Sequence, residues 1–474
     1  MSLEDTPGKL HTKTLITMLK KNAILVLAIV GCLCACDRGP AKLTSLVPGI
    51  PSAAPDYFCT WNVQGFISGW ETPRQPMNEE YLFGDGLYQN WTGFFPGFRE
   101  DLYFVMDDSW DIPLAEERDS PSFGTTMLDT TRFPSFRGDP AGRLKMLADS
   151  IKARGWKGAG GWIHAGKPAA FADITEEEFW TERLKESEHA GFDYWKVDWG
   201  PRSHDGQWRR MLTGLGHQYA PDLWIEHASP FNVGEPFPHK EFIEFSDVFR
   251  TYDVEPNTAQ ALTIQRIVEV LPYKAEEGAK GIINCEDEPY IAVGLGCAIG
   301  VMRHEFRGGY PNGIPDYPFH ESGRNVKGRI DEIARGVRWH RIAGPFGVDG
   351  TYEADPVMLE DYWYLREYET WVTSYAPGDT VRFSAPARVS RGMPLPELSD
   401  SDAPDRPFIL ASRYPNGAVA LAAISRTMGR SIAGKELDAT IKMDDPAAPI
   451  GIFGRFSEVN IEFPENIDWK KVSI

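Results

Sequence analysis

Two residues in the stretch GFDYWKVDWG, residues 191–200, have types and a spacing that could do chemistry. Lys196 and Asp198 are two positions apart, and residues two apart on a β-strand project to the same face. Many Lys-x-Asp pairs are solvated ion pairs of little energetic weight. Here tryptophans at 195 and 199 occupy the alternate positions, so we expect them on the opposite, packed face. The cation and the carboxylate would then face one space, as at the C-terminal rim of a barrel strand.

Polar side chains follow most of the apolar segments that precede residue 305. They are Trp61 and Asn62, Asp107 and Asp108, His164, Lys196 and Asp198, Glu226 and His227, Arg250 and Asp253, and Glu286 and Asp287. A single acidic residue at such a place is more often a helix cap, but so many strand ends together indicate an active site. Glycoside hydrolysis needs two carboxyl groups, aromatic platforms and hydroxyl-binding groups, and this set supplies all three.

Two other barrel chemistries fit the sequence less well. A lysine that forms a Schiff base needs an apolar pocket, whereas Lys196 is paired with Asp198. The histidines lack paired ligand spacing, and the three cysteines after residue 36 form neither a zinc motif nor a disulfide framework. We therefore expect no metal and no cofactor.

Alternating short apolar runs and amphipathic runs predict the elements that position these residues. Helices are expected at 141–155 and 176–191, each closed by glycine. Eight strands predict an α/β fold, a (β/α)8 TIM barrel over 56–350, and short runs beyond 355 predict a C-terminal antiparallel β-sandwich over 355–474. The strands are expected at 58–62, 102–108, 157–165, 193–199, 223–228, 247–253, 281–287 and 297–304.

Four segments resemble the clan D α-galactosidases, glycoside hydrolase families 27 and 36. FCTWNVQGF is similar to their Trp-Asn opening strand, LYFVMDDSW to their Asp-Asp-x-Trp strand, and YWKVDWG to their Lys-x-Asp nucleophile strand. The run FPSFRGDPAGRLKMLADSIKARGWKGAGGWI, residues 133–163, follows their path through a helix into the third strand. The resemblance covers about residues 57–310 and keeps the strand order, which is more specific than any one motif.

The resemblance implies a role for each matching residue. Asp198 would be the nucleophile, kept ionised by Lys196, and Asp253 would be the acid/base, which needs a raised pKa. The remaining expected substrate contacts are Trp61, Asp107, Asp108, Trp162, Lys196, Glu226 and Arg250.

The sequence departs from the family pattern in two places. In RTYD the acid/base candidate follows Arg250 by three residues, which is closer to the family 36 form, so Glu255 remains a rival to Asp253. The segment IEHASP lacks the family's Cys-Glu-Trp signature. The resemblance implies a retaining exo-α-glycosidase, of α-galactosidase type, acting on an oligosaccharide or glycoside. Alternatives are a β-L-arabinopyranosidase, an α-N-acetylgalactosaminidase, or a sugar-binding lipoprotein without catalysis.

Charge and the N-terminal segment indicate where the chain works. A formal net charge of −19 over 474 residues argues against nucleic acid as a partner. The segment MLKKNAILVLAIVGCLCAC reads as a targeting leader, with a start at Met1 or Met18. LCAC resembles a bacterial lipobox, which predicts lipidation at Cys36, a leader over 1–36 and a tether over 37–55. We therefore expect a bacterial cell-envelope protein that meets the membrane through a lipid anchor only, its oligomeric state being open.

Overall fold

The structure is a computed structural model and describes residues 48–69, 71–230, 236–252, 258–306, 326–366, 375–399 and 402–464. The expected leader with Cys36 and both acid/base candidates, Asp253 and Glu255, lie outside the described residues. Within those ranges, no helix is long and apolar enough to cross a membrane.

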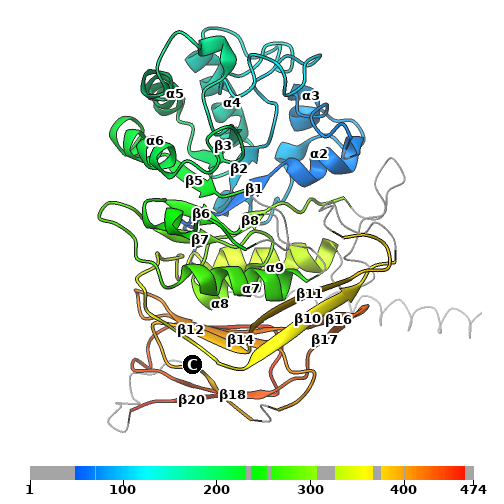
Figure 1. The fold of residues 1–474 in the computed structure, drawn as a ribbon, viewed down its shortest axis with the longest axis vertical. Coiled ribbons are helices and arrows are strands. Elements are labelled where there is room, and N and C mark those ends of the chain that lie inside the picture. Colours follow the sequence, from blue (N-terminus) through cyan, green and yellow to red (C-terminus); the bar gives the residue numbers. More distant parts are fainter. Residues whose placement is uncertain are drawn as a thin grey trace, which may run out of the picture. The chain divides into compact units, whose positions relative to one another are not determined.

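Eight parallel strands form the predicted barrel, in the order β7-β6-β5-β4-β3-β2-β1-β8 (Figure 1). Because every paired strand runs parallel to its neighbour, the carboxyl ends of the strands all open at one rim. The strands are β1 (Tyr57–Cys59), β2 (Tyr103–Met106), β3 (Gly158–Ile163), β4 (Tyr194–Val197), β5 (Trp224–Ala228), β6 (Val248–Arg250), β7 (Ile282–Asn284) and β8 (Gly300–Val301).

The barrel closes between β7 and β8 through a short parallel bridge of Asn284 with Ala298. The Ala298 N–H donates to the Ile283 carbonyl at 2.7 Å. On the other side of β8, the Asp56 carboxylate accepts from the Ile299 N–H at 2.8 Å and meets the His340 ring at 2.6 Å. Backbone bonds therefore close the seam between β7 and β8, while the buried Asp56 holds the start of β8 on the β1 side.

Helices surround the strands where the sequence pattern predicts them. The predicted helix at 176–191 is confirmed: Thr175 and Glu178 form a reciprocal capping box at its start, and Gly191 ends it at φ +62°. The helix predicted at 141–155 begins one residue earlier, since Asp139 caps it ahead of Pro140. The helices are α2 (Trp61–Ser68), α3 (Glu79–Phe83), α4 (Pro140–Ala153), α5 (Glu176–Ala190), α6 (Gly206–Tyr219), α7 (Ala259–Val270), α8 (Pro289–Leu295) and α9 (Val326–Trp339).

Each barrel strand is shorter than expected, down to Gly300–Val301 for β8, and β1 and β6 illustrate the difference. β1 ends at Cys59, because Val63, Phe66 and Ile67 have helical spacing and α2 begins at Trp61. β6 ends at Arg250. Both predicted strands had been extended into the residues that follow the rim.

Three sheets make up the C-terminal region and give the barrel-plus-sandwich fold that was expected. Antiparallel pairs such as β14 with β15 are mixed with parallel ones, such as β12 with β14 and β15 with β19, so the sheets are not purely antiparallel. Their strands are β9 (Tyr352–Ala354), β10 (Met358–Tyr364), β11 (Thr380–Pro386), β12 (Arg388–Arg391), β13 (Glu397–Leu398), β14 (Phe408–Arg413), β15 (Val419–Ile424), β16 (Arg426–Gly429), β17 (Ser431–Ala433), β18 (Asp438–Lys442), β19 (Ile450–Phe453) and β20 (Glu458–Glu462).

Helix α8 packs directly on two of these strands, β14 and β15. A Cβ at Gly294 would lie 2.9 Å from the Leu410 Cβ and 3.0 Å from the Ala422 Cβ, so only glycine permits this approach. At the end of the helix, the Arg391 guanidinium donates to the Leu295 carbonyl at 2.7 Å. Barrel and sheets accordingly belong to one compact unit, residues 50–474.

Candidate active site

Strand β4 presents Lys196 to the barrel interior and is continued at the rim by Asp198, as their spacing predicts. On the outer face, the Trp195 indole N–H donates to the Ser187 hydroxyl of α5 at 3.2 Å. Trp199 does not follow Trp195 under the helices, which corrects our expectation. Because β4 has ended at Val197, the alternation stops there, and the Trp199 ring lies 5.7 Å from that of Trp162.

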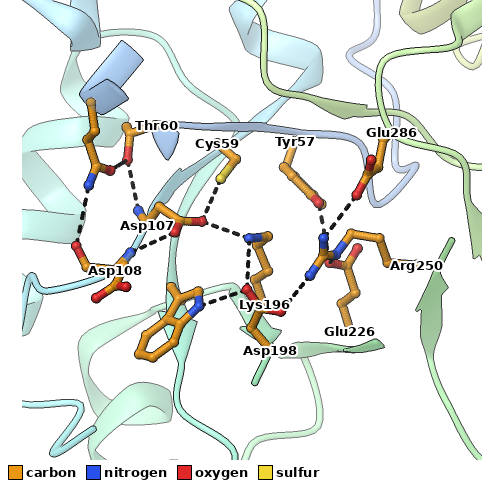
Figure 2. A network of polar contacts seen from close by, with 12 residues as sticks. Tyr57, Cys59, Thr60, Asp107, Asp108, Lys196, Asp198, Glu226, Arg250 and Glu286 are labelled. Atoms are coloured by element: carbon orange, nitrogen blue, oxygen red, sulfur yellow. Dashed lines mark hydrogen bonds and ion pairs between the residues drawn. The ribbon is translucent and has the colours of Figure 1, made fainter. Parts of the chain in front are cut away.

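Asp198 is the centre of a buried polar network (Figure 2). Its Oδ1 accepts from the Arg250 guanidinium at 3.0 Å, and its Oδ2 accepts from the Trp162 indole N–H at 3.0 Å. The Lys196 ammonium lies 3.6 Å from the same Oδ2. Burial alone would raise the pKa of Asp198, but Lys196 and Arg250 outweigh it, and the net pKa is lowered. The carboxylate is therefore ionised, as a nucleophile must be.

Lys196 joins Asp198 to a second carboxylate, Asp107, which directly follows β2. Its ammonium donates to Asp107 Oδ2 at 2.7 Å, and the Cys59 thiol donates to the same oxygen at 2.8 Å. Burial alone would lower the pKa of Lys196. The negative charge of Asp107 outweighs this effect, so the net pKa of the lysine is raised. Burial also raises the pKa of Cys59, so the thiol keeps the proton that it donates.

Asp108 is attached to this network through its backbone. Its N–H donates to Asp107 Oδ1 at 2.8 Å, while its own carboxylate accepts from Arg74 at 2.6 Å and from the Ser109 hydroxyl at 2.7 Å. Thr60, just before α2, accepts the Asp107 N–H at 2.8 Å. The two consecutive aspartates after β2 thus pair with different cations: Asp107 with Lys196, and Asp108 with Arg74.

Arg250 ends β6 and is 1% exposed. Each nitrogen of its guanidinium meets a different carboxylate: NH2 meets Asp198 at 3.0 Å, NH1 meets Glu286 at 2.9 Å, and Nε meets Glu226 at 3.2 Å. The three carboxylates come from the ends of β4 and β7 and from within β5. One planar cation therefore fixes three strands relative to one another.

Glu226 is fully buried beneath Arg250. Its oxygens accept from the Tyr57 hydroxyl at 3.3 Å, the Tyr194 hydroxyl at 2.9 Å and the Asn284 amide at 2.6 Å. Burial raises the pKa of Glu226, and Arg250 and Asn284 oppose that rise. With these donors in place, the acceptor positions of the carboxylate are largely filled. A sugar would have to displace one of them to reach Glu226.

Aromatic side chains line two sides of the network. Trp61, at the start of α2, packs against the interior cluster that contains Tyr57 and Cys59. Trp162 packs with Phe123, Trp199 and Ile112 in a second cluster, with the Phe123 ring 5.3 Å away. Trp61 and Trp162 were both expected from the sequence. Phe123 was not, because it lies in the long segment between β2 and α4 and has no periodic signal.

Of the other polar residues at the strand ends, His227 and Asp287 have partners outside the network around Asp198, whereas Glu286 belongs to it. His227 faces α6, with its ring nitrogens 3.1 Å from Arg209 and 2.8 Å from the Thr213 hydroxyl. Asp287 turns toward β8 and pairs with Arg303 at 3.2 Å. Glu286 joins the network on Arg250, although its sequence position suggested no particular role. Tyr57 and Tyr194 were missed, since a tyrosine inside a strand reads as core.

Among the residues that the structure describes, no three His, Cys, Asp or Glu side chains are grouped to hold a metal ion. The chain matches no protein-family model and no curated protein. Solved structures resemble it weakly, and the fold assignment rests on the strand order given above.

Three of those solved structures illustrate the similarity. A candidate α-galactosidase of Bacteroides fragilis is 13% identical, with a TM-score of 0.42 over 78% of this chain and 66% of its own. A family GH27 β-L-arabinopyranosidase of Geobacillus stearothermophilus is 16% identical, with a TM-score of 0.29 over 46% of this chain and 57% of its own. α-Galactosidase I of Mortierella vinacea is 15% identical, with a TM-score of 0.39 over 71% of this chain and 95% of its own.

A buried carboxyl next to the site gives a pH-dependent prediction. Asp111 is 4% exposed, and burial raises its pKa from 3.8 to about 7. Because the folded state holds this proton more tightly than the unfolded chain, the stability that the proton contributes is present below pH 4 and is lost as the pH rises through about 7.

Replacing Asp111→Asn removes that loss. We expect the variant to exceed the original protein in free energy of unfolding at pH 8.5, by at least about 1 and at most about 4 kcal/mol, and to gain clearly less at pH 5, where only the smaller part of the loss has occurred. Urea unfolding at both pH values measures this, with Asp119→Asn, an exposed residue of the same segment, as the control. An equal effect of Asp111→Asn at both pH values would contradict the prediction.

Proposed function

We propose that the chain is a retaining exo-α-glycosidase of the clan D type, with an α-galactoside or a related sugar as substrate. One observation carries the proposal: Asp198 is buried, ionised and held on both oxygens by Arg250, Trp162 and Lys196 at the rim of a parallel barrel. The order of the Trp-Asn, Asp-Asp and Lys-x-Asp segments supports the same assignment.

In the proposed mechanism an oxygen of Asp198 attacks the anomeric carbon and forms a glycosyl ester, while the bond to the leaving oxygen breaks. The acid/base gives its proton to the leaving oxygen. Water then attacks the same carbon, returns a proton to the acid/base and releases Asp198. Asp107 and Asp108 would bind sugar hydroxyls and Trp61 a sugar face, as the family resemblance implies.

A sugar-binding protein without catalysis is the alternative from another class. Buried carboxylates and aromatic walls would serve binding as well as reaction. The two functions differ in what Asp198 is for, since a binding protein has no use for a nucleophile.

Replacing Asp198→Asn separates these functions. The amide is nearly isosteric but a poor nucleophile, so we expect release of nitrophenol from a panel of α-glycosides to fall by more than about 1000-fold, a change of about 4 kcal/mol in the barrier. Sugar binding by calorimetry and the unfolding midpoint should change little. Asp173→Asn, an exposed aspartate, serves as the control. A rate within tenfold of the original would place the nucleophile elsewhere, and no hydrolysis by the unchanged protein would favour the binding function.

The acid/base is proposed to be Asp253, with Glu255 as the rival. We expect Asp253→Asn to lose most of its activity on substrates with a poor leaving group and much less on nitrophenyl glycosides, because a good leaving group needs no protonation. Rates of Asp253→Asn and Glu255→Gln on both substrate types identify the residue. The reverse pattern would assign the role to Glu255.

We also propose that lipidated Cys36 anchors the protein to the bacterial envelope. Cys36→Ser should move the protein from the membrane to the soluble fraction, because an acyl chain contributes roughly 0.8 kcal/mol per buried methylene and serine carries none. Fractionation followed by immunoblotting measures the change. A variant that stays with the membrane would exclude this anchor.

A further inference from the structure

Glu286 occupies a place that its neighbours determine closely. It follows β7, is 5% exposed, and has φ +52°, a left-handed conformation that is uncommon for any residue but glycine. Its N–H donates to the Asn284 side-chain oxygen at 2.8 Å, and the amide of that side chain donates to Glu226 at 2.6 Å. Strain of this kind persists only where the surroundings hold it, and it is concentrated at functional sites.

The turned backbone brings the Glu286 carboxylate to the guanidinium that Asp198 uses (Figure 2). Glu286 Oε1 lies 2.9 Å from Arg250 NH1, and Asp198 Oδ1 lies 3.0 Å from Arg250 NH2. The guanidinium is planar and rigid, so a change at one terminal nitrogen is felt at the other. Glu226 lies 3.2 Å from the third nitrogen and has no exposed surface. Of these two described carboxylates that share Arg250 with Asp198, Glu286 is therefore the outer one.

We propose that Glu286 is a positioning residue of the reaction, which sets through Arg250 how much positive charge reaches the Asp198 carboxylate. The inference rests on the proposed function. A second anion on the guanidinium, and its own negative charge nearby, leave Asp198 more basic than Arg250 alone would. A more basic carboxylate attacks faster in the first step and departs more slowly in the second. Glu286 therefore acts on the two steps in opposite directions.

The test compares the two steps in Glu286→Gln, which keeps the shape and an acceptor for Arg250 but removes the charge. kcat/KM reports the first step. Reactivation of a glycosyl-enzyme, formed with a fluorinated glycosyl donor of the sugar that the enzyme cleaves, reports the second. We expect kcat/KM to fall about tenfold while reactivation is unchanged or faster. Glu286→Asp keeps the charge, so its ratio of the two rates should stay near that of the original enzyme.

The matched control is Glu288→Gln. Glu288 lies two residues further on, is 4% exposed and pairs with Arg329 at 3.1 Å, a different arginine from the one at Asp198. It should leave the ratio of the two rates unchanged. Equal losses in both steps for Glu286→Gln would show a merely structural role, and no change in either would show none; both results overturn the inference.

The same experiment distinguishes this inference from the proposed function. If the fluorinated donor labels Asp198 in the original enzyme, the proposed function stands, and only the rates of the Glu286 variants decide the role of Glu286. If it labels no residue or another residue, the proposed function fails and this inference with it.

Discussion

The pairing of buried carboxylates with Lys196 and Arg250 is the interaction on which the rest of the site depends. A carboxylate that is taken out of water without a partner costs several kcal/mol. Asp107, Asp198, Glu226 and Glu286 are each less than one-tenth exposed, yet each lies within about 3.3 Å of one of these two cations. Removing either cation would leave at least one buried carboxylate without a cation, so the loss would exceed the value of any single contact.

The barrel makes this pairing achievable because it brings strand ends together from all parts of the chain. Lys196 and Asp107 are 89 positions apart, and Tyr57 and Glu226 are 169 apart. The seam needs equally close fitting: a Cβ at Gly300 would lie 2.8 Å from both the Asn284 amide nitrogen and the Tyr57 hydroxyl. The side chains that donate to Glu226, Tyr57 and Asn284, are thus the ones that pack against Gly300 of β8. Closing the barrel and positioning Glu226 therefore depend on the same contacts.

The sequence predicted what depends on strand periodicity. The barrel, the shared face of Lys196 and Asp198, and the gathering of polar side chains from many strand ends at one rim follow from alternation and from the common direction of parallel strands. It could not predict what happens once a strand has ended. Trp199 turns to Trp162 because β4 stops at Val197, and Glu286 reaches Arg250 through a left-handed residue. No local pattern reports where a backbone leaves the strand.

The charges of the network are unequal, and this has a chemical consequence. Among the residues that the structure describes, the carboxylates of Asp107, Asp198, Glu226 and Glu286 contact the two cations Lys196 and Arg250. Neutral groups donate further hydrogen bonds to these carboxylates. They are the Cys59 thiol, the Tyr57 and Tyr194 hydroxyls on Glu226, and the Trp162 indole N–H. Burial raises the pKa of both tyrosines, so these donors remain neutral. The described part of the site is therefore preorganised around the negative charge of the Asp198 carboxylate. A neutral sugar gains little from that charge, whereas a transition state with oxocarbenium character gains much, and it is this difference that lowers a barrier.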